Sequence, residues 1–158
     1  MKYWFLCRYR GGGKKCGRAL LYAKRTLFYK GGRRKKVLIV ITDGRSLDSV
    51  RSPARYLKRR KVTICSVGIG RRYNVRQLYQ MASSRRFVFK SRFRNVGKLV
   101  EPIQKAVCKA AGNQWVTSSF DSCNFSYFLN GFWWTRRSVN SSCKLCFGIL
   151  LVVPINSK

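Results

Sequence analysis

The side chains that most enzymes use for acid–base chemistry are scarce in this sequence. Its 158 residues include four Asp or Glu residues and no His. General acid–base catalysis depends on groups such as a His or a pair of carboxyl groups held near the reacting atoms. We therefore expect the protein not to be an enzyme.

Asp43 is a carboxylate at a position where a binding site would form. It follows Val37–Ile41, an unbroken aliphatic run typical of a strand buried on both faces of a parallel sheet. Asp43-Gly44 is a turn signal that ends this strand. Ligands of open parallel sheets bind beyond the carboxyl ends of the strands, so Asp43 is a candidate binding residue. The alternative is an Asp that only hydrogen-bonds its own turn.

Three other motifs are incomplete. The pair Cys143-x2-Cys146 is half of a zinc site, but the sequence has no His and no second closely spaced Cys pair. The spacing Gly12-x4-Gly17 resembles a phosphate-binding loop, but Arg18-Ala19 follows instead of Lys-Ser/Thr. The Gly68-Ile69-Gly70 turn lacks the third glycine of a dinucleotide fingerprint. We expect neither zinc nor a nucleotide.

Helices and strands alternate through residues 11–112. Apolar spacing predicts helices over 17–29, over 50–57 with Asp48 or Ser49 as its N-cap, after the cap Asn74, and over 96–111. Strands are predicted at 37–41, at 62–68 with a turn at Gly68-Ile69-Gly70, and at 86–89 near a sheet edge. This order predicts an α/β three-layer sandwich with a mostly parallel sheet.

The two ends of the chain do not follow this pattern. Residues 1–10 are a segment of unclear status, and their apolar stretch is too short for a secretory signal peptide. Residues 113–158 form a tail rich in Cys and aromatic residues, of unknown structure. No apolar run is long enough for a transmembrane segment. Either the chain is cytosolic or its true N-terminus lies upstream.

The charge of the chain is strongly positive. Its 35 Lys and Arg residues against four acids give a net charge of +31. Clusters lie at Arg33-Arg34-Lys35-Lys36, Lys58-Arg59-Arg60-Lys61, Arg71-Arg72 and Arg85-Arg86, with aromatic residues near them. Such an excess favours binding to polyanions, and we take the first two clusters as candidate polyanion-binding residues. Each cluster alone is also typical of a solvated helix end.

Four ordered blocks together resemble a von Willebrand factor type A domain, of the kind found in matrilins and non-fibrillar collagens. They are Gly11–Leu20, Val37–Ser46, Val62–Gly70 and the closing helix that ends at Cys108. The match covers residues 11–112 and lacks the family's first strand and its Asp-x-Ser-x-Ser loop. The resemblance implies a Rossmann-type topology and a non-enzymatic adhesion module of the extracellular matrix, although this chain shows no signal peptide.

The resemblance also implies a divalent metal site, which this chain does not complete. An intact member binds Mg²⁺ through Asp-x-Ser-x-Ser, a Thr and an Asp. Asp43 takes the position of the last Asp, Lys14 takes that of the Thr, and the Asp-x-Ser-x-Ser cluster is missing. We expect no cofactor in the chain as written, with Asp43 a remnant of the adhesion site. Cys108 resembles the cysteine that closes such domains in a disulfide.

The expected function is therefore protein–protein contact with a matrix or cell-surface partner through a defective metal site. The alternative is a basic protein that binds a polyanion, either a heparin-like glycosaminoglycan or nucleic acid. The resemblance implies that the family's first strand is central to the sheet, so its loss would expose backbone groups and apolar faces.

Overall fold

The computed structural model describes residues 3–6, 14–26, 28, 36–111 and 149–154. Its helices are α1 (Cys16–Thr26), α2 (Arg51–Arg59), α3 (Val75–Met81) and α4 (Val100–Ala111), with 3-10 turns η1 (Arg85–Phe87) and η2 (Phe93–Leu99). Its strands are β1 (Tyr3–Leu6), β2 (Lys36–Gly44), β3 (Val62–Arg72), β4 (Val88–Ser91) and β5 (Ile149–Pro154). None of the helices in these ranges is long and apolar enough to cross a membrane.

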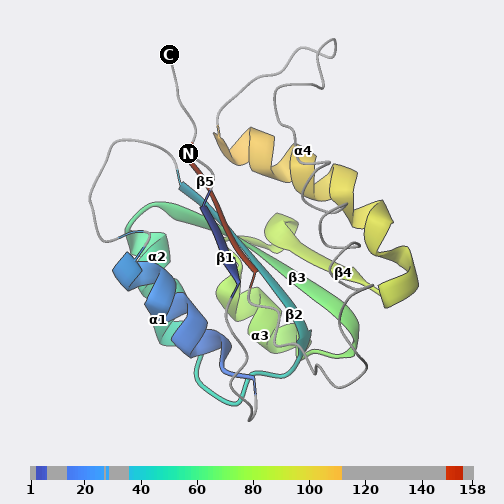
Figure 1. Ribbon diagram of the computed structural model, residues 1–158, viewed down its shortest axis with the longest axis horizontal. Helices are drawn as coiled ribbons and strands as arrows, with labels where there is room; N and C mark the ends of the chain where they lie inside the picture. The colour runs from blue at the N-terminus through green and yellow to red at the C-terminus, as the bar shows by residue number, and fades with distance from the viewer. Residues whose placement is uncertain (1–2, 7–13, 27, 29–35, 112–148, 155–158) are drawn as a thin grey trace.

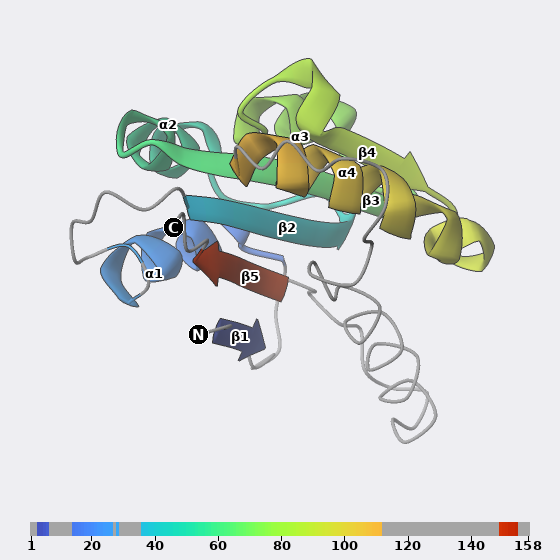
Figure 2. The same ribbon diagram turned by 90° about the horizontal axis from the view of Figure 1, so that it is seen from above.

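The five strands form one sheet in the order β1-β5-β2-β3-β4. The strands β2, β3 and β4 are parallel, and β5 is antiparallel to both β2 and β1. Figure 1 shows α1, α2 and α3 on one side of this sheet and α4 on the other. Figure 2 shows the strands side by side with α4 in front of β3. The α/β three-layer sandwich with a mostly parallel sheet is confirmed.

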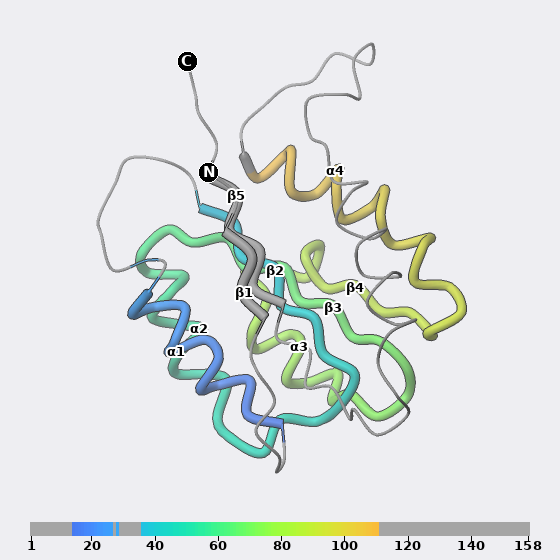
Figure 3. The backbone as a smooth tube through the Cα atoms, viewed as in Figure 1, coloured from blue at the N-terminus to red at the C-terminus, as the bar shows by residue number. Residues whose placement is uncertain are grey.

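The two faces of β2 bury alternate side chains in two separate cores. Leu38 and Val40 pack with residues of α1, α2 and α3, such as Leu20. Val37 and Ile39 pack on the other face with Ile103 and other residues of α4. Figure 3 shows the path of the chain that places β2 between these two groups of helices. The unbroken aliphatic run therefore has the double-sided burial that its sequence predicts.

The strand β5 comes from the end of the chain and pairs with the free edge of β2. Its register places Val152 opposite Leu38 and Leu151 opposite Ile39, and its other edge pairs with β1. The sequence left residues 1–10 and 113–158 without assigned structure, and short strands from both extend the sheet. The edge of β2 that faces away from β3 is thus covered by an antiparallel strand.

Several local predictions were wrong in detail. The strand β3 continues through Gly68 and Gly70 to Arg72 instead of turning there. The residue at the N-cap of α2 is Val50, with no side-chain cap, because Asp48 is bound elsewhere. The last helix begins at Val100, since residues 93–99 form a 3-10 turn. Asn74 does cap α3, and its side chain accepts a hydrogen bond of 3.2 Å from the Gln77 amide.

Removing residues 149–158 tests whether β5 is required at the edge of β2. We expect the free energy of unfolding to fall by at least about 2 kcal/mol, because several ladder hydrogen bonds of about 0.5–1.5 kcal/mol each would be lost. The uncovered edge should also promote aggregation. Urea denaturation and light scattering measure both effects. A chain lacking only residues 155–158 is the control, and equal stability of the two truncated chains would contradict the assignment.

Candidate binding site at the carboxyl edge of the sheet

Asp43 lies at the carboxyl end of β2, where the ladder to β3 becomes irregular. Thr42 is opposite Gly68, whereas Gly44 is opposite Arg72, so the register shifts across Asp43. Irregularities of this kind redirect a side chain out of the regular alternation of a strand. Thr42 is buried, and its hydroxyl donates a 2.9 Å hydrogen bond to the Gly44 carbonyl. Asp43 is therefore held on a fixed piece of backbone.

The carboxylate of Asp43 forms an ion pair with the Lys14 ammonium group. The two side chains are 21% and 22% exposed, so the pair is partly shielded from water. Gly44 permits this approach, because a Cβ atom there would lie 2.6 Å from the Lys14 Nζ. The site thus has its own cation, Lys14, which lies two residues before the start of α1.

The loop after β2 caps the N-terminus of α1. The Asp48 carboxylate accepts hydrogen bonds from the Gly17 amide at 2.9 Å and the Arg18 amide at 2.7 Å. The Ser46 hydroxyl accepts one from the Cys16 amide at 2.9 Å and donates one to Asp48 at 2.6 Å. A carboxylate at this position satisfies free amides and complements the helix dipole. Asp48 therefore holds α1, and with it Lys14, against the end of β2.

A second clamp fixes the same loop to α3. The Gln77 side chain accepts a hydrogen bond from the Ser46 amide and donates one to the Ser46 carbonyl, both at 2.9 Å. The oxygen and the nitrogen of the Gln77 side chain are both used. The loop after β2 is therefore bound to α3 as well as to α1. The carboxyl edge around Asp43 is consequently pre-formed.

Cys16 is the first residue of α1, and its side chain is buried at the base of this site. Its thiol donates to the Thr42 hydroxyl at 3.8 Å. Burial is the main cause that raises the pKa of Cys16, and burial alone raises the pKa of Cys65 on β3 to about 12. Both thiols therefore remain protonated at neutral pH, which argues against either as a nucleophile or metal ligand.

The comparison with known protein families decides the identity of this fold. The family model for the von Willebrand factor type A domain matches residues 5–102. The chain belongs to the von Willebrand factor type A domain family. The predicted resemblance is thereby confirmed, and the match extends to residues before Gly11.

The similar proteins of this family are components of the extracellular matrix. The collagen alpha-1(XXI) chain of Homo sapiens is 30% identical over 105 residues, which are 64% of this chain and 11% of that protein. Vitrin of Mus musculus is 44% identical over 62 residues, 39% of this chain and 10% of that protein. Cochlin of Mus musculus is 27% identical over 106 residues, 65% of this chain and 19% of that protein. The chain thus spans only a small part of these relatives.

Solved structures of the same fold include proximal thread matrix protein 1 from the mussel byssus. The form with a zinc-occupied MIDAS motif has a TM-score of 0.58 at 26% identity, covering 62% of this chain and 27% of that one. A second crystal form has a TM-score of 0.54 at 28% identity, covering 60% of this chain and 24% of that one. Von Willebrand factor type A domains use the MIDAS site to bind a metal ion.

The residues around Asp43 do not fit such a metal. Magnesium requires about six oxygen ligands in a near-octahedral arrangement. The described part of the chain has no group of three or more His, Cys, Asp or Glu side chains that could hold a metal ion. The Asp43 carboxylate is bound by Lys14, whose ammonium group cannot coordinate a cation and repels it.

Among the basic candidate residues from the sequence, those that the structure describes lie away from Asp43. Lys36 and Val62 are paired in register, so Lys36 and the cluster Lys58–Lys61 lie at the amino edge of the sheet. Arg33, Arg34 and Lys35 lie outside the described residues. Cys108 is half-buried on α4, and its disulfide stays a prediction.

The cluster Lys58-Arg59-Arg60-Lys61 is partly engaged in structural contacts. Lys58 donates to the Gln80 carbonyl at 2.9 Å, and burial lowers its pKa. Arg60 donates to the Tyr56 hydroxyl at 3.1 Å. Arg59 and Lys61 are exposed. The polyanion role of these residues stays a prediction.

The supporting residues Ser46, Asp48 and Gln77 were missed as parts of the site. The sequence does signal that Asp48 is a capping residue, because it precedes a helix. It caps α1, which lies about thirty positions earlier in the chain, instead of the helix that follows it. Only the spatial arrangement of the two elements reveals this choice.

A double-mutant cycle at Lys14 and Asp43 tests the ion pair. Lys14→Met should lower the free energy of unfolding by about 1–3 kcal/mol, because it leaves a partly buried carboxylate without its cation. Adding Asp43→Asn should recover part of this loss, giving a coupling energy of at least about 0.5 kcal/mol. Chemical denaturation of the four proteins measures it. Strictly additive effects would show that the two charges do not stabilise each other.

Proposed function

We propose that the chain is a non-enzymatic protein-interaction module of the extracellular matrix whose binding edge works without a metal ion. Its partner would be a matrix or cell-surface protein, and its location extracellular. The observation that carries the proposal is the ion pair between Lys14 and Asp43. It places a tethered ammonium group beside the only carboxylate of the site that matches the family's metal-binding pattern.

The family supports the interaction role. Its matrix members in collagens, vitrin and cochlin are generally interaction modules and not enzymes. The edge around Asp43 is rigid, since Ser46 is bound to α1 and to α3. A rigid surface loses little conformational entropy when it binds a partner.

Leu47 provides an apolar contact next to the ion pair. Leu47 is 69% exposed, and its backbone amide donates a 2.8 Å hydrogen bond to the Lys14 carbonyl. A fixed backbone therefore presents a large apolar side chain to solvent beside a charged pair. We propose Leu47 as a contact residue of the interaction surface.

Divalent cations should leave the melting temperature of the protein unchanged. A ligand that binds only the folded state raises the melting temperature, so an absent shift indicates absent binding. Differential scanning fluorimetry with Mg²⁺ or Mn²⁺, against EDTA, measures this. Lys14→Thr, which removes the ammonium group, is the comparison variant. A metal-dependent rise in the unmodified chain would refute the metal-free site.

Binding to partners should likewise resist EDTA. The measurement is biolayer interferometry of the chain against a panel of purified matrix proteins, with EDTA or Mg²⁺ present. Leu47→Asp should weaken any interaction that uses the carboxyl edge, with the exposed Leu21→Asp on α1 as the control. Binding that requires Mg²⁺ would overturn the proposed mode, and no binding to any matrix protein would argue against the interaction role.

A second candidate function is attachment to polyanions. Its support is the net charge of +31. Charge of this magnitude attracts sulfated glycans and nucleic acid without requiring a shaped site. The exposed cations Arg59 and Lys61 would contribute together with Arg33, Arg34 and Lys35.

Heparin affinity should fall steeply as salt rises. Each neutralised anionic group releases a counterion, so the logarithm of the binding constant falls linearly with the logarithm of the salt concentration. Isothermal titration at several salt concentrations gives the slope. A shallow slope would exclude electrostatic attachment as the main mode.

A further inference from the structure

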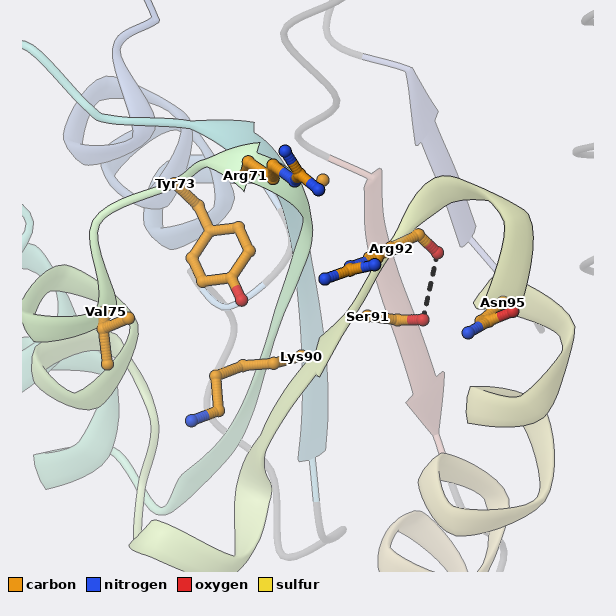
Figure 4. Close-up of a pocket in the computed structure, with 8 residues that line it drawn as sticks. Arg71, Tyr73, Val75, Lys90, Ser91, Arg92 and Asn95 are labelled. Atoms are coloured by element: carbon orange, nitrogen blue, oxygen red, sulfur yellow. Dashed lines mark hydrogen bonds between the residues drawn. The ribbon is translucent and has the colours of Figure 1, made fainter.

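A basic pocket lies at the carboxyl edge of the sheet, where β3 and β4 end (Figure 4). It has a volume of about 610 Å³, within the usual range of ligand sites. Its lining residues are Gly70, Arg71, Tyr73, Val75, Lys90, Ser91, Arg92 and Asn95. They come from β3, β4, η2 and the start of α3. Neither Asp43 nor Lys14 is among them.

The frame of this pocket is held by close packing. Gly70 has a φ of +91°, and a Cβ atom there would lie 2.6 Å from the Phe93 ring, so η2 packs directly on the end of β3. The Tyr73 ring packs on Gly68, where a Cβ atom would lie 2.8 Å from it. At Gly70, only glycine adopts the positive φ without strain. The pocket is thus built by the fold, not by a loose loop.

Three exposed cations line the same pocket as Tyr73. Figure 4 shows the Arg92 guanidinium between Tyr73 and the end of β4, with Arg71 above the ring and Lys90 below it in this view. No acidic residue is among the lining residues. Among the described residues, none forms a salt bridge with Arg71, Lys90 or Arg92.

The described acids are all engaged elsewhere. Asp43 is paired with Lys14, Asp48 with the first amides of α1, and Glu101 with Lys105. The three pocket cations therefore repel one another with no described carboxylate to balance them. A bound anion would relieve this repulsion.

We propose that this pocket binds the sulfate groups of a sulfated glycan. Arginine presents a planar fork of donors that matches an oxyanion with two parallel hydrogen bonds, and the lysine adds a third charge. The Tyr73 ring offers an apolar surface for the sugar ring between sulfates. The inference rests on the second candidate function and gives it a specific site.

The shape of the pocket favours a glycan over nucleic acid. Proteins that bind single strands stack successive bases on several aromatic rings along an extended basic groove. Here one half-buried ring lies in a single pocket. A short sulfated saccharide presents several charges on one sugar ring, which matches three cations and one tyrosine that line a single pocket.

The test compares two triple variants with the same loss of charge. The pocket variant is Arg71→Gln/Lys90→Gln/Arg92→Gln. The control is Arg25→Gln/Arg51→Gln/Arg55→Gln, which removes three exposed arginines from α1 and α2 that line no part of the pocket. Binding of a heparin-derived tetrasaccharide, its desulfated form and an oligonucleotide of equal charge is measured by isothermal titration. Melting temperatures confirm that both variants fold.

We expect the pocket variant to bind the sulfated tetrasaccharide at least about tenfold more weakly, because charge-assisted hydrogen bonds are lost. The control should lose less than about threefold, as expected for screened surface charges. The desulfated form should bind poorly to all proteins.

Equal losses in both variants would overturn the pocket and leave diffuse polyanion attachment standing. Tighter binding of the oligonucleotide, lost only in the pocket variant, would overturn the glycan assignment. Failure of the unmodified chain to bind even full-length heparin would refute the second candidate function itself, and the pocket with it.

Discussion

The structure depends on burying one strand on both faces. Leu38 and Val40 of β2 contribute to one core, and Val37, Ile39 and Ile41 to the other. A strand placed in this way also requires hydrogen-bonded neighbours on both edges, because neither face nor edge is open to water. β3 supplies one edge and β5 the other. The helices on both faces and the carboxyl edge of the sheet are positioned by this central strand.

The same central strand explains how one acidic residue is held so firmly in a basic chain. Asp43 follows the buried run, and the loop behind it is bound to α1 through Asp48 and to α3 through Gln77. Two of the three described acids thus organise the start of α1 and the end of β2. Each of the three described carboxylates has a partner within the fold, which leaves the pocket cations Arg71, Lys90 and Arg92 without a described acid beside them.

The sequence predicted the central features well and the long-range ones poorly. The aliphatic run of β2, the cap Asn74 and the alternation of helices and strands depend on local spacing, which the sequence displays directly. The residue that Asp48 caps depends on which helix lies nearby, and the sequence does not display this. The place of β5 beside β2 is a pairing across more than a hundred residues, and short apolar runs do not specify their partners. Asp43 could be chosen as a candidate from its place after the aliphatic run, whereas the grouping of Arg71 and Arg92 from the ends of different strands required the fold.

The pairing of β1 with β5 has a mechanical consequence for a protein of this family. Tyr3 is opposite Val152 and Leu6 is opposite Ile149, so the outer ends of both strands lie at the same end of the ladder. Tension applied to Tyr3 and Pro154 would break the hydrogen bonds of this ladder one residue pair at a time, starting at Tyr3 and Val152, instead of loading all of them in shear at once. The parallel strands β2, β3 and β4 lie on the other side of β5 and are not part of the ladder that opens first.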